Sequence, residues 1–213
     1  PRTMASGEAY RDLGEAAWTW VVSQVADDDG PWLPATMPDE PQELAPAEDR
    51  DSLYAGIAGL APVLAEIAMH RAHNDVEEVL ATRIVERLRA QANVRIEASL
   101  YDGLAGDATA LKMLAPGSEL VALRRLVDLM TPAGWNTTIA MESGSDAPLT
   151  DVVCGTAGIV LAAIWAGGEH AETIAVTGGE CLLRVADQTE GGLDWGTRPG
   201  ETSRMPNLSL IHI

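Results

Sequence analysis

Apolar residues recur every three or four positions along much of this chain, which is the spacing of amphipathic helices. In the first such segment Tyr10, Leu13 and Trp20 fall on one face. Charged residues such as Glu78 and Arg89 occupy the opposite face of a later one. The pattern predicts four helices of this kind, over residues 9–26, 75–91, 119–130 and 171–187. We predict no series of strands.

A second set of helices is apolar nearly all round, and each opens on the same short phrase. The three copies read Gly56-Ile57-Ala58-Gly59, Gly103-Leu104-Ala105-Gly106 and Gly155-Thr156-Ala157-Gly158, at intervals of 47 and 52 residues. A period of this size indicates a repeated unit that holds two helices. Helices that are apolar on all sides must be buried on several sides. We therefore predict inner helices over 56–71, 103–114 and 155–166.

Inner apolar helices that alternate with outer amphipathic ones are typical of a curved stack of helical hairpins. We predict an all-α fold, an α/α toroid that is incomplete and contains about three inner and outer helix pairs. Glycines at the helix starts would allow close backbone approach and positive φ angles at the turn. The helix N-termini could also offer free N–H groups to an anion.

The composition excludes several classes of function. The net charge is −18, so the chain should repel nucleic acid and anionic membrane surfaces. No apolar run reaches the length of a membrane span, and two cysteines are too few for a disulfide framework. We expect a cytoplasmic protein that binds neither nucleic acid nor membrane.

The repeated phrases and the residues before them resemble the lanthionine synthetase C-like family, the cyclases of lanthipeptide biosynthesis and their relatives. The resemblance rests on Ser52–Gly59, Leu100–Gly106 and Thr150–Ile159, with a fourth piece at Arg204–Ser209. It covers about residues 9 to 209. It implies a toroid of α-helices with glycine-rich phrases at the starts of the inner helices.

The resemblance implies a Michael addition. In the family a zinc ion activates a thiol, which attacks a dehydroamino acid and forms a thioether ring. The partner would be a dehydrated precursor peptide or a small thiol. By the same resemblance Asp151, four residues before Gly155, is the candidate catalytic acid/base residue.

The chain also departs from the family. The histidine expected after Ser209 is absent, because the chain reads Leu210-Ile211-His212-Ile213. The family's zinc ligands open later inner helices, so zinc is expected for the full-length family and no metal site is predicted here. We therefore interpret residues 1–213 as a single toroid domain, truncated at its C-terminus and inactive alone. Within it, 27–50 is predicted to be a loop and 210–213 an atypical tail. An open half ring would expose apolar helix faces and should be poorly stable or self-associate.

Two alternatives stay open. The chain could be a non-catalytic member of the same family that binds a peptide or a thiol. It could also be an α/α-toroid glycoside hydrolase or lyase, with Asp102, Asp107 and Asp151 as candidate acids. The aromatic content of 4% disfavours a sugar cleft. Cys154 is either a core residue or a thiol with a pKa lowered by the nearby helix start.

Overall fold

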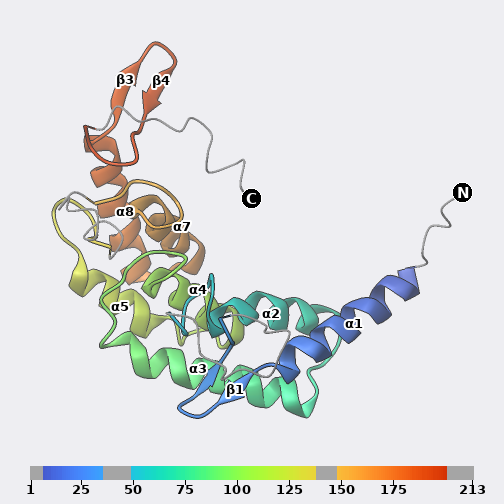
Figure 1. Ribbon diagram of the computed structural model, residues 1–213. Helices are drawn as coiled ribbons and strands as arrows, with labels where there is room; N and C mark the ends of the chain where they lie inside the picture. Colours follow the sequence, from blue (N-terminus) through green and yellow to red (C-terminus); the bar gives the residue numbers. More distant parts are fainter. Residues whose placement is uncertain (1–6, 36–48, 138–147, 201–213) are drawn as a thin grey trace, which may run out of the picture.

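The chain is mostly helical, as a computed structural model shows for residues 7–35, 49–137 and 148–200. The predicted all-α class is confirmed (Figure 1). Its helices are α1 (Gly7–Ser23), α2 (Ala61–His70), α3 (Asp75–Ala92), α4 (Leu104–Leu114), α5 (Leu120–Leu129), α7 (Thr156–Ala166) and α8 (Glu169–Arg184). A short 3-10 helix, η1 (Ile57–Leu60), leads into α2.

Three helical hairpins pack side by side in two layers. The hairpins are α2 with α3, α4 with α5, and α7 with α8. In the inner layer α4 packs against both α2 and α7, and in the outer layer α5 packs against both α3 and α8. The hairpins follow an arc in Figure 1, with α3, α5 and α8 along its outside. This is the alternation of inner and outer helices that the sequence pattern predicts.

The core lies between the two layers. Inner helices contribute Leu64, Leu104, Leu111 and Ile159, which are fully buried. Outer helices meet them with one face only, as Ile84 and Leu88 do from α3. Helix α7 carries no charged residue, in keeping with its place in the inner layer.

Helix α1 differs from the prediction in the face that it buries. Tyr10, Leu13 and Trp20 are exposed, and the buried side chain is Trp18. The indole N–H of Trp18 donates to Glu77 Oε1 at 2.8 Å. Val21, Val22 and Val25 at the end of the segment are partly buried against the core, whereas the earlier part of the predicted apolar face is exposed.

Two small β-hairpins were not predicted. Strand β1 (Ala26–Asp27) pairs with β2 (Pro31–Trp32), inside the segment 27–50 that we predicted as a loop. Strand β3 (Asp187–Thr189) pairs with β4 (Gly192–Asp194). Strands of two or three residues are too short for alternation to reveal them. The rest of the predicted loop from 36 to 48, the phrase at 204–209 and the tail 210–213 lie outside the described residues.

Candidate functional site: the loop stack

The segments that precede the inner helices form one continuous structure, which we call the loop stack (residues 49–56, 96–103 and 148–155). In each loop the same backbone hydrogen bond closes onto a carbonyl seven residues earlier. The bonds are Ile57 N to Arg50 O (2.9 Å), Leu104 N to Glu97 O (3.0 Å) and Thr156 N to Leu149 O (2.9 Å). These N–H groups are therefore used within the loops. The hypothesis that the helix starts offer them to an anion is wrong for these groups.

The first glycine of each phrase is required by close approach. Gly56, Gly103 and Gly155 have φ angles of −107°, −138° and −114°, so the expected positive φ is wrong. A Cβ atom at any of the three would lie within 3 Å of backbone atoms of the same loop. Real Cβ atoms essentially never come so close to backbone. Only glycine lets each loop fold back on its own helix start.

The second glycine of the second and third phrases allows neighbouring loops to approach each other. A Cβ on Gly106 would lie 3.1 Å from Leu53 Cβ, and one on Gly158 would lie 3.0 Å from Leu100 Cβ. Each of these leucines belongs to the preceding loop. The three phrases therefore cluster at one end of the inner layer.

Backbone hydrogen bonds continue from loop to loop. The N–H of Tyr54 donates to Tyr101 O at 3.1 Å, and the N–H of Tyr101 donates to Val153 O at 3.3 Å. The rings of Tyr54 and Tyr101 lie with their centroids 5.8 Å apart. The tyrosines thus pack against one another at the edge of the stack, with Tyr54 largely exposed.

Asp151 occupies the capping position of the third loop. Its Oδ1 accepts the N–H groups of Val153 (2.7 Å) and Cys154 (2.9 Å). In the first loop Ser52 Oγ accepts from Ala55 and Gly56, and in the second Ser99 Oγ accepts from Asp102. The three residues stand at the same place in their loops. Asp151 thus does the structural work of a serine and adds a half-buried carboxylate to the stack.

Cys154 lies just after this cap and keeps its proton. Burial, together with the carboxylates of Asp151, Asp102 and Glu97, raises the pKa of its thiol to about 12. A protonated thiol is a poor nucleophile and a poor metal ligand. The suggestion that the helix start lowers this pKa is wrong, because acidic neighbours and burial outweigh the helix dipole.

Asp107 is a buried carboxylate beneath the loop stack. It is fully buried in the first turn of α4, and neither oxygen accepts a hydrogen bond from the described residues. The equivalent residues of the other repeats are Leu60 and Ile159, which are also buried. Burial raises the pKa of Asp107 to about 7, against the opposing pull of Arg95. Aligning the three phrases would have revealed this exception from sequence.

Arg95 connects Asp107 to the loops above it. One guanidinium nitrogen lies 3.5 Å from Asp107 Oδ1. The other binds both the carboxylate of Asp49 and the carbonyl of Asp102. Burial raises the pKa of Asp102, and the neighbouring Asp49 and Glu97 carboxylates add to the shift. Arg95 therefore contacts Asp107 together with the carboxylate of Asp49 and the backbone of Asp102 in the first two loops.

The described residues do not fit a zinc site. No group of three or more His, Cys, Asp or Glu side chains among them is arranged to hold a metal ion. Cys181 is buried in α8, far along the chain from Cys154. No chemistry through zinc is therefore derived for this part of the chain.

The fold and the loop stack define a protein built of repeated helical hairpins with chemistry-bearing side chains at the inner helix starts. Comparisons with family models, with curated proteins and with solved structures find no match for this chain. None of the helices in the described part is long and apolar enough to cross a membrane.

Proposed function

We propose that this chain is the hairpin-repeat part of a lanthionine synthetase C-like protein. Such proteins add a thiol to a dehydroamino acid of a peptide and form a thioether ring. In this proposal the hairpins form part of an α/α toroid, and the loop stack lines its mouth. In this proposal the chain's own role is to bind the dehydrated peptide or a small thiol.

One observation carries the proposal: three loops with the same closing backbone hydrogen bond meet at one end of the inner layer, and Asp151 lies in the third. The backbone of these loops is fixed by close approach of glycine, while its side chains vary from loop to loop. A rigid backbone with variable side chains suits a site that must hold reacting groups in place. Asp151, with one carboxylate oxygen used for capping, would act as acid/base or orient another group.

A non-catalytic, peptide- or thiol-binding member of the same family is the second candidate. The protonated Cys154 and the missing metal group in the described residues favour binding over chemistry for this chain. The coding DNA beyond Ser209 separates the candidates. Further repeats that open with cysteine and histidine would support the cyclase, and repeats without them would support the binding protein.

The glycoside hydrolase or lyase alternative gains no support. It would need paired carboxylates at the mouth, and Asp107 is fully buried beneath the loops. Asp102 and Asp151 are half-buried. We do not pursue this alternative.

Peptide binding tests the proposal directly. A fluorescent peptide with one dehydroalanine and one cysteine is titrated with the protein, and its anisotropy is recorded. The control peptide carries alanine at both positions. We expect saturable binding that is about tenfold tighter for the first peptide, which corresponds to roughly 1.4 kcal/mol. Equal affinity for the two peptides, or no binding, would overturn the proposal.

Ring formation is followed separately by counting the thiols that remain open to alkylation. We expect no loss of thiol with this chain alone, even with added zinc, because the metal group is missing. If a zinc-bearing longer form is active, Asp151→Asn should abolish its activity while preserving the cap. An active Asp151→Asn enzyme would remove the assigned acid/base role.

Exposed apolar side chains support the open-ring part of the proposal. Leu161, Ile164 and Trp165 of α7 are each at least half exposed, although α7 belongs to the inner layer. We expect concentration-dependent self-association by sedimentation, and Ile164→Lys should weaken it. A monomer at all concentrations would contradict an open ring.

A further inference from the structure

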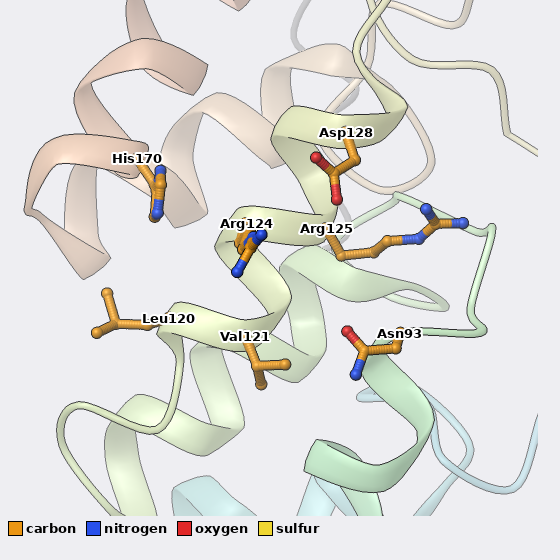
Figure 2. A pocket seen from close by; sticks show the side chains of 7 residues that line it. All are labelled: Asn93, Leu120, Val121, Arg124, Arg125, Asp128 and His170. Atoms are coloured by element: carbon orange, nitrogen blue, oxygen red, sulfur yellow. The ribbon is translucent and has the colours of Figure 1, made fainter.

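On the outside of the arc, a pocket of about 570 Å³ lies between the end of α3, the outer face of α5 and the start of α8. It opens between outer helices, and no residue of the loop stack lines it. Figure 2 shows the side chains that line it: Asn93, Leu120, Val121, Arg124, Arg125, Asp128 and His170. The proposed function does not involve this pocket.

The pocket concentrates cationic groups on a chain whose net charge is −18. Arg124 and Arg125 are consecutive on α5. His170 lies in the first turn of α8, and Arg125 extends away from it, towards the other side of α5 (Figure 2). Several arginines elsewhere are ion-paired, as Arg71 is with Glu77 at 2.7 Å. Neither pocket arginine has an ion-pair partner among the described residues.

Arg125 is fixed in place without being neutralised. Its Nε donates to the carbonyl of Arg95 at 3.2 Å, which leaves its terminal nitrogens unbound within the described chain. Arg124 makes no hydrogen bond to any described residue, and its side chain is exposed. Asp128 lines the same pocket, and no ion pair joins it to either arginine in the described part. Two guanidinium groups are therefore available to a ligand.

The backbone N–H groups at the start of α8 attract negative charge, and Glu169 and Glu172 in the first turn offset part of this attraction. The N-cap of α8 is Gly168, which has no side chain that could accept hydrogen bonds from the first N–H groups of the helix. The opposite wall is apolar, with Leu120 half exposed and Val121 beside it. The N–H groups of a guanidinium match the spacing of phosphate oxygens. An apolar wall beside them suits an apolar substituent on the phosphate.

We propose that this pocket binds a phosphate monoester with an apolar substituent. Arg124 would bind the phosphate oxygens from α5, with His170 opposite on α8. Leu120 and Val121 would contact the substituent. Asn93 would donate its amide N–H groups from the end of α3.

Titration calorimetry with inorganic phosphate and with phenyl phosphate tests this proposal, at constant ionic strength with chloride as the replaced anion. We expect saturable binding of both, with phenyl phosphate the tighter. Arg124→Gln should weaken both by about tenfold, since a charge-assisted hydrogen bond is lost. Asp128→Asn should tighten both, because it removes a repelling charge.

Arg89→Gln is the matched control, because Arg89 is exposed on α3 and does not line the pocket. It should bind phosphate as the unaltered chain does. His170→Gln provides a second pocket variant and should also weaken binding. The proposal fails if phosphate does not saturate, if Arg124→Gln behaves like Arg89→Gln, or if phenyl phosphate binds no more tightly than inorganic phosphate.

Discussion

The loop stack and the attachment of α1 hold the chain together in opposite ways. In the loop stack, backbone close approach repeats three times and the side chains differ between loops. At α1, one network of side chains occurs once: Arg71 binds Glu77 and Glu15, and Trp18 binds Glu77. A contact made by backbone leaves side chains free to vary, so chemistry can be placed there. A contact made by charged side chains does not allow such variation.

Adding one methyl group to the loop stack should break it. In Gly158→Ala the new Cβ would collide with the carbonyl of Val152 and with Leu100, neither of which can move without the backbone. We expect a loss of about 3 kcal/mol or more in the free energy of unfolding, measured by urea denaturation. Gly179→Ala on α8 is the control, because its Cβ would meet nothing within 4 Å. A stable Gly158→Ala protein would refute the close-approach argument.

Removing one charge should break the α1 attachment. Glu77 is buried and accepts hydrogen bonds from Arg71, Trp18 and the backbone of Asn74. We expect Glu77→Gln to cost about 2 kcal/mol near neutral pH, less than a fully buried pair because Arg71 is partly exposed. Urea denaturation measures this loss.

The pH dependence of this loss follows from the pKa of Glu77. Hydrogen bonds from Arg71 lower this pKa to about 2, so the folded state favours the ionised form. The stabilisation is present above the ordinary pKa of 4.5 and is lost as the pH falls toward 2. The difference between Glu77→Gln and the unaltered chain should therefore shrink over that range. A constant difference would contradict the ion pair.

Replacing Asp107 tests the contrast with the α1 attachment, because we expect the loop stack to tolerate a change of side chain. Asp107→Leu copies the Leu60 of the first repeat and leaves Arg95 bound to Asp49 and Asp102. We expect a gain of about 1.5 kcal/mol at pH 8, because a buried carboxylate is removed.

The pH dependence of stability expected from Asp107 is opposite in sign to that expected from Glu77. Its raised pKa, about 7, means that the folded state favours the protonated form. The unaltered chain should lose stability as the pH rises from 4 through 7, and Asp107→Leu should not. Urea denaturation at pH 5 and pH 8 measures both. A variant less stable at both pH values would show that the carboxylate has a structural partner.

The smallest expected effect is at the cap of the third loop. Asp151→Ala removes the acceptor for Val153 and Cys154 and should cost about 1 kcal/mol. Asp151→Ser copies Ser52 and Ser99 and should cost much less. Thermal denaturation compares the two. Equal losses would mean that the capping bonds contribute nothing measurable.

The helices and their pairing could be predicted from the sequence, because they depend on local periodicity and on the repeat. Helix α4 was expected at 103–114 and lies at Leu104–Leu114, and the clustering of Gly59, Gly106 and Gly158 followed from their repetition. Small residues at equal intervals permit backbones to crowd, and that property belongs to the sequence alone.

Only the tertiary structure decided which backbone atoms approach the glycines and which charged side chains lie beneath the loop stack. The glycines avoid collisions with loop carbonyls and do not need positive φ, and Trp18 is buried where Tyr10 and Leu13 were expected. The pKa of Asp107 depends on burial, Arg95 and Asp49, and the pKa of Cys154 depends on burial, Asp151 and Asp102. Burial and charge act through space, so no local pattern along the chain could have assigned them.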